Sequence, residues 1–107
     1  MSVARVLVPA QAKRGELIDV RIAIQHPMET GFRFDNSGKS IAKNTINNFV
    51  CRYNGAEVLR AEMGSGIAAN PYLQFYILAQ NSGNIEFSWV DDAGEKGSAS
   101  SAIQVTA

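Results

Sequence analysis

The stretch that decides the fold is residues 16–25, with the sequence ELIDVRIAIQ. Apolar and polar side chains alternate along it with a period of two, which places one set on each face of an extended chain. One face carries Ile18, Val20, Ile22 and Ile24, and the other carries Asp19, Arg21 and Gln25. A helix would mix the two sets, so the stretch predicts a β-strand with one buried face.

Similar alternation recurs in six other segments, namely residues 5–8, 48–53, 57–63, 72–79, 85–90 and 99–105. Turn residues separate these segments. Asn54-Gly55 is the strongest hairpin signal, because both residues accept a positive φ, and the DDAG sequence at residues 91–94 is typical of a turn. Apolar residues seldom recur at the spacing of three or four positions that an amphipathic helix requires. The sequence therefore predicts one all-β domain over residues 1–107, an immunoglobulin-like antiparallel β-sandwich of about seven strands.

Composition excludes several classes of function. Ten basic and ten acidic residues give a formal net charge of zero, whereas nucleic acids and acidic lipids require clustered, uncompensated basic residues. The single cysteine and single histidine exclude a disulfide framework and a standard zinc site. No stretch approaches the roughly 20 apolar residues that span a bilayer. We therefore expect no nucleic-acid partner, no membrane partner and no cofactor.

The first ten residues do not resemble a secretory signal peptide. Their apolar run is shorter than the core of about 7–15 apolar residues that such a signal needs, and Lys13 and Arg14 follow closely. We expect a cytosolic protein, or one that is exported together with a partner that carries the signal. A mature chain given a new initiating methionine would look the same.

The reactive side chains do not form a recognisable catalytic set. Cys51 could act as a nucleophile or redox thiol, but it lies in phase with Phe49 and Tyr53 on an alternating strand, which favours a buried, inert thiol. A metal site built from His26, Met28 and Cys51 has suitable ligand types but no recurring spacing. The sequence therefore favours a binding or scaffold module over an enzyme.

Two surfaces are candidates for partner contact. The first is a set of apolar or aromatic residues out of phase with the predicted core, namely Tyr72, Tyr76, Leu78, Val50 and Val90. Such residues can form an apolar docking face. The second is the connection at residues 26–43, which is long for so small a domain. Its candidate residues are His26, Met28, Glu29, Arg33 and Asp35. They either contact a partner or tie down the loop.

Four segments resemble the SoxZ family of sulfur-oxidation proteins. The strongest is HPMETGFRFD at residues 26–35, followed by Gly38 and Ile41, which is similar to the family stretch H-x-M-E-[ST]-G-x-R-x-D-x-x-G-x-x-I. The others are NFVC at residues 48–51 with Asn54-Gly55, NPYLQF at residues 70–75 and FSWVDDAG at residues 87–94. Their order and spacing agree with the family. Ala42-Lys43 stands where family members often carry Pro-Arg.

The resemblance implies the scaffold subunit of a sulfur carrier. It implies a periplasmic heterodimer with SoxY, in which a cysteine on the C-terminal arm of SoxY covalently holds the intermediates of thiosulfate and sulfide oxidation. This chain ends in AIQVTA at residues 102–107, without a cysteine or a glycine-rich tail, so we expect the intermediates on SoxY. The resemblance also implies transient contacts with the haem, hydrolase and dehydrogenase components of the Sox system, and export together with SoxY.

Two other classes of function stay open from the residues alone. One is a small sulfurtransferase-like redox protein that uses Cys51 as its nucleophile. The other is a sandwich binding module unrelated to sulfur, which the absence of a recognisable signal peptide would suit.

Overall fold

The computed structural model describes residues 3–64 and 66–107, and these residues form eight strands and no helix. The strands are β1 (Val3–Leu7), β2 (Gln11–Lys13), β3 (Leu17–Gln25), β4 (Ile46–Tyr53), β5 (Ala56–Ala61), β6 (Tyr72–Leu78), β7 (Gly83–Asp91) and β8 (Lys96–Thr106). Seven of them fall on the segments that the alternation predicts. The eighth, β2, is a short strand that follows Pro9 and was not predicted.

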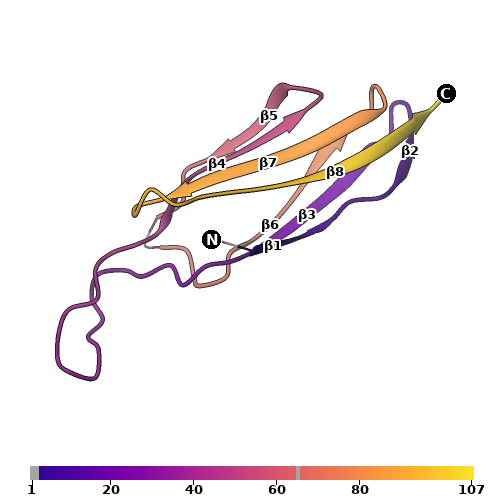
Figure 1. Ribbon diagram of the computed structural model, residues 1–107. Coiled ribbons are helices and arrows are strands. Elements are labelled where there is room, and N and C mark those ends of the chain that lie inside the picture. Colours follow the sequence, from indigo (N-terminus) through magenta and orange to yellow (C-terminus); the bar gives the residue numbers. More distant parts are fainter. Residues whose placement is uncertain (1–2, 65) are drawn as a thin grey trace.

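The strands form two sheets that pack face to face (Figure 1). The smaller sheet has the order β1-β3-β6, and the larger has the order β2-β8-β7-β4-β5. Every neighbouring pair is antiparallel except β2 with β8. The predicted all-β sandwich is thus confirmed. Within the described residues, no helix is long and apolar enough to cross a membrane.

The core lies between the two sheets and uses the inward-facing residues of each strand. The four apolar residues of β3 that the alternation placed on one face, from Ile18 to Ile24, are each at most 1% exposed. The larger sheet presents Phe49, Cys51, Ile85, Phe87 and Trp89 to the same core. Fully burying one such side chain stabilises the fold by about 1.5–3 kcal/mol, so this layer supplies most of the driving force for folding.

The Asn54-Gly55 hairpin forms as predicted between β4 and β5. Asn54 has a φ of 50° and Gly55 a φ of 84°, which is the pair of positive values that a two-residue hairpin turn requires. The Oδ1 atom of Asn54 also accepts a hydrogen bond from the Asn84 backbone N–H at 3.0 Å. This contact fixes the turn against the start of β7.

Between β3 and β4 the chain leaves the sandwich as a projecting arm, defined here as residues 27–45 (Figure 1). Two isolated bridges, Glu29 with Asn44 and Phe34 with Ser40, pair its two legs. The arm contributes to an elongated molecule with extents of 60 × 20 × 18 Å. The predicted long connection is therefore a two-legged ribbon held outside the sheets.

Candidate interaction surfaces

The outer surface of the smaller sheet carries a group of exposed apolar side chains, called here the apolar face. Its members are Val3, Leu7, Leu17, Tyr72, Tyr76 and Leu78, each between 49% and 65% exposed. They share a surface because they alternate with the buried residues of β1, β3 and β6. Leu17 of β3 lies directly opposite Leu78 of the neighbouring strand β6. The structure thus brings the predicted Tyr72, Tyr76 and Leu78 together with three further apolar residues.

Val50 and Val90 do not belong to this face, so the expectation that they join it is wrong. They come from β4 and β7 of the larger sheet, where they line a hollow of about 490 Å³ on its outer surface. Alternation reports which residues share a phase within a strand, but it does not report which of the two sheets contains that strand.

A compensated ion pair lies in the middle of the apolar face. Nη2 of Arg21 lies 2.9 Å from Oδ2 of Asp19, and the Gln74 amide donates to Asp19 at 3.2 Å. The hydrogen bond from Arg21 lowers the pKa of Asp19, although partial desolvation opposes this shift. Leu7 and Tyr72 help to line a hollow of about 130 Å³ beside Arg21. A partner that covers this face would therefore meet one ion pair that is already formed, and beside it the exposed Arg5, which lines the same hollow.

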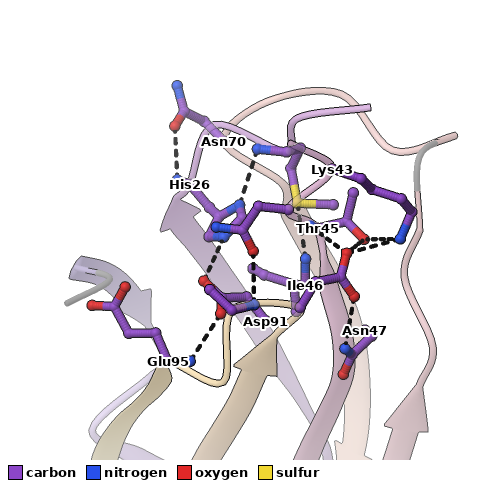
Figure 2. A network of polar contacts seen from close by, with 12 residues as sticks. His26, Lys43, Thr45, Ile46, Asn47, Asn70, Asp91 and Glu95 are labelled. Atoms are coloured by element: carbon purple, nitrogen blue, oxygen red, sulfur yellow. Dashed lines mark hydrogen bonds and ion pairs between the residues drawn. The ribbon is translucent and has the colours of Figure 1, made fainter. Parts of the chain in front are cut away.

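The first leg of the arm is fixed at its base by His26 (Figure 2). Its Nε2 atom lies 3.1 Å from Oδ2 of Asp91, and both residues are buried. Its Nδ1 atom accepts a hydrogen bond from the Met28 backbone N–H at 2.9 Å. Because an N–H group can only donate, Nδ1 must be unprotonated, and Nε2 therefore carries the proton that is donated to Asp91. Met28 itself has a left-handed φ of 50°.

The second leg is fixed by the neighbouring carboxylate, Asp92. Its Oδ2 accepts hydrogen bonds from Nζ of Lys43 at 2.8 Å and from the backbone N–H of Thr45 at 2.9 Å. Its Oδ1 accepts from the Asn47 amide at 3.0 Å. These bonds, that from Lys43 above all, hold the pKa of Asp92 well below its usual range. The two adjacent aspartates thus hold the two legs of the arm.

Sequence reasoning assigned residues 91–94 to a turn, and this is confirmed by the hydrogen bond from Gly94 N–H to the Asp91 carbonyl at 3.0 Å. It missed that Asp91 and Asp92 also anchor the arm. A local signal was present, since adjacent residues at a strand end point in opposite directions. Their partners lie more than 40 positions earlier in the chain, so the sequence did not reveal the contact.

The candidate residues of the arm occupy three different settings. His26 and Met28 are each 4% exposed, so these side chains hold the base and are not free to touch a partner. Glu29 is half-buried, and its Oε1 accepts from Nη1 of Arg33 at 2.7 Å. Arg33 and Asp35 are exposed. Their contact with a partner stays a prediction.

The tip of the arm is an ordered turn. Oδ1 of Asp35 accepts hydrogen bonds from the Ser37 N–H at 2.9 Å, the Ser37 hydroxyl at 2.7 Å and the Lys39 N–H at 3.0 Å. Gly38, with a φ of 83°, donates its N–H to the Asp35 carbonyl. The hydrogen bond from Ser37 is the main reason that the pKa of Asp35 is lowered. Side chain and backbone therefore fix the same tip geometry.

Cys51 is buried in the core, as its phase predicts. It is 0% exposed, and burial raises the pKa of its thiol to about 12. A thiol of this kind stays protonated near neutral pH and is a poor nucleophile. In residues 3–64 and 66–107, no three His, Cys, Asp or Glu side chains gather as metal ligands would. Both ring nitrogens of His26 are engaged within the protein.

The sandwich is similar to those of several solved structures. Superoxide reductase (neelaredoxin) from Ignicoccus hospitalis matches with a TM-score of 0.71 and 17% identity, over 96% of this chain and 80% of that one. The sulfur carrier protein SoxY from Chlorobium limicola f thiosulfatophilum matches with a TM-score of 0.66 and 13% identity, over 97% and 79%. These likenesses show the fold alone. No match was found among curated proteins.

A comparison of the sequence with family models gives a more specific result. The model for the sulphur oxidation protein SoxZ matches residues 5–102. That range includes the arm, both of its aspartate anchors and nearly all of the two sheets. The chain therefore belongs to the SoxZ family of sulphur oxidation proteins.

Proposed function

We propose that this chain is the non-catalytic subunit of a periplasmic sulfur carrier and that it forms a heterodimer with SoxY. In this proposal the cysteine on the C-terminal arm of SoxY covalently holds the sulfur intermediates of thiosulfate and sulfide oxidation. The present chain helps to present them to the haem, hydrolase and dehydrogenase components. It reaches the periplasm by export together with SoxY. Membership of the SoxZ family supports this assignment.

The apolar face is the observation that best supports a heterodimer with SoxY. Six large apolar side chains gather there, each about half exposed or more. Exposed apolar groups of this kind, bordered by polar residues, mark protein–protein interaction sites. A stable interface needs a total buried area of about 1,200–2,000 Å², and a three-stranded sheet offers a broad surface for one. The sandwich fold of SoxY makes packing of one sheet on another available to the pair.

The setting of Cys51 supports placing the sulfur on the partner. Covalent sulfur transfer requires an accessible thiolate, whereas this thiol is buried and its pKa is raised to about 12. The alternative of a sulfurtransferase-like protein that uses Cys51 would require the sandwich to open. The alternative of a module unrelated to sulfur is disfavoured by the family match.

The arm residues divide their roles in this proposal. His26, Met28 and Glu29 position the arm, because they are buried or half-buried at its base. Arg33 and Asp35 lie further out and are exposed. They belong to the surface that the carrier presents to other proteins.

The double variant Tyr76→Lys/Leu78→Lys tests the pairing. Tyr76 of β6 lies opposite Asp19 of the neighbouring strand β3. A lysine at position 76 would therefore have a carboxylate nearby, and the fold should survive the substitution. We expect the dissociation constant for SoxY to rise by at least about 30-fold, the effect of losing one hot-spot residue. The matched control is Val58→Lys, since Val58 is 43% exposed on β5, away from the apolar face. Unchanged affinity for SoxY in a folded double variant would refute the pairing.

A further inference from the structure

Two phenylalanines stand exposed on the arm. Phe32 is 84% exposed and Phe34 is 68% exposed, and no other large apolar side chain in the described residues is as exposed as Phe32. Exposed aromatic side chains of this size are costly in water and mark interaction sites when they occur together. They are not part of the apolar face, because they lie on the arm outside both sheets (Figure 1).

The register of the arm places both rings on one side. Phe34 pairs with Ser40 across the two legs. Gly31 lies beside Lys43, since a Cβ built at Gly31 would be 3.3 Å from Cβ of Lys43. The legs are antiparallel, so the next residue on the first leg, Phe32, lies opposite Ala42 on the second. Residues two apart along an extended leg share a side. Phe32 and Phe34 therefore fall on the same side of the first leg, opposite the small residues Ala42 and Ser40 of the second.

The arm that carries the two rings is already ordered before any partner binds. At the base, the buried His26 fixes the first leg and the exposed Asp92 fixes the second. At the tip, Asp35 fixes the turn through three hydrogen bonds. An element that is already ordered loses little conformational entropy when it binds. The arm is therefore built to insert its rings without first folding around a partner.

The position of the rings favours a protein groove over a lipid surface. The residues that lead at the tip are polar, with the sequence DNSGK at residues 35–39, whereas the phenylalanines lie behind the tip on one side. An element that lies on a bilayer combines its apolar side with a polar face rich in Lys and Arg, whereas Arg33 and Lys43 of the arm are already paired with Glu29 and Asp92. An arm with aromatic residues on its side, behind a polar turn, fits a groove whose far end is open to water.

The size of the contact indicates a transient partner. A buried phenylalanine contributes about 150–250 Å², so the two rings give roughly 300–500 Å² on this side. Counted on both partners, this is roughly 600–1,000 Å², below the total of about 1,200 Å² or more that stable subunits bury and in the range of weak encounters. The apolar face is broad enough for a permanent subunit, whereas the arm suits a protein that binds and leaves.

We infer that Phe32 and Phe34 dock into an apolar groove of an enzyme that processes the sulfur held by the carrier. This inference rests on the proposed function, since it takes the chain to be part of such a carrier. The arm then acts as a fixed recognition element, separate from the surface that binds SoxY. It allows an enzyme to bind the carrier through a part of the complex that does not bear the sulfur.

The test uses the heterodimer reconstituted with Phe32→Ser/Phe34→Ser, because both side chains are exposed and their loss should not unfold the chain. Val58→Ser is the matched control. The purified haem, hydrolase and dehydrogenase components are titrated with each heterodimer and with the chain alone. We expect the dissociation constant or KM for at least one component to rise by about tenfold or more. The melting temperature and the affinity for SoxY should stay unchanged.

Three results would overturn the inference. Weaker SoxY binding by the double variant would place the arm in the subunit interface. Equal affinity of the double variant and wild type for all three components would remove the docking role. Co-sedimentation of the wild-type chain, but not the variant, with phosphatidylglycerol vesicles would make the arm a membrane contact. If wild type forms no heterodimer, the proposed function fails, and the titrations of the chain alone still decide the role of the rings.

Discussion

The imidazole of His26 donates through Nε2 to the carboxylate of Asp91, which lies 65 positions later in the chain, and both side chains are buried. The contact joins the first residue after β3 to the last residue of β7. It sets the direction in which the arm leaves the sandwich. The backbone of His26 is held as well, since its N–H donates to Oδ1 of Asn70 at 3.0 Å (Figure 2).

Replacing Asp91 should therefore destabilise the fold and not only the arm. Asp91→Ala leaves the Nε2–H of His26 buried without an acceptor, which costs about 1–3 kcal/mol, and it also removes the bond from the Glu95 N–H at 2.9 Å. Urea unfolding should show this loss. Asp91→Asn should recover part of it, because the amide oxygen still accepts. Equal stability of Asp91→Ala and wild type would contradict the role given to this pair.

Asp92 should make the stability of the chain depend on acid pH. Lys43, Asn47 and Thr45 hold its pKa in the folded state below the unfolded value of about 3.9. The stabilisation is therefore present above that value and is lost as the pH falls through the folded pKa. Asp92→Asn should lower the melting temperature at pH 7 and should flatten its fall below pH 5. Parallel pH profiles for variant and wild type would show that Asp92 contributes nothing.

Cys51 should not react in the folded chain. Burial excludes reagents, and the raised pKa of about 12 keeps the thiol protonated at pH 8. A thiol reagent at pH 8 should therefore label the chain fully in denaturant and leave the native chain unlabelled over the same time. Rapid stoichiometric labelling of the native chain would favour the alternative in which Cys51 acts as a nucleophile.

Gly97 should be intolerant of a side chain. A Cβ there would lie 2.3 Å from the ring of Trp89, which is buried, and overpacking of this kind costs about 1–3 kcal/mol. Gly97→Ala should lower the free energy of unfolding by that amount. The control is Gly64→Ala, because a Cβ at Gly64 meets no atom within 4 Å and its φ is not left-handed. A similar loss in both variants would point to a general effect of alanine.

The sandwich was predictable because each long strand has one buried face, and burial on one face leaves a period of two in the sequence. The run from Ile18 to Ile24 and the Asn54-Gly55 turn needed only local information. Strand β2 was not predictable in this way. It has three residues, and it pairs in parallel with β8 at the other end of the chain, so its stability comes from a contact that is distant in sequence.

The candidate surfaces were predictable only in part, for the same reason. Phase along β6 identified Tyr72, Tyr76 and Leu78 as outward-facing, and the structure places all three on the apolar face. The long connection was identified by its length, but its anchors at Asp91 and Asp92 depend on tertiary contacts. The sequence therefore located the arm without showing what holds it or that its two phenylalanines, Phe32 and Phe34, are exposed.

The central claim is that this chain is the partner-binding subunit and that the sulfur is held elsewhere. Intact-mass analysis of the chain, purified without denaturation from a periplasmic extract with whatever binds it, tests this most directly. We predict an equimolar partner that carries sulfur adducts on a cysteine of its C-terminal arm, with Cys51 of this chain unmodified. Recovery of this chain alone, with a sulfur adduct on Cys51, would contradict the claim.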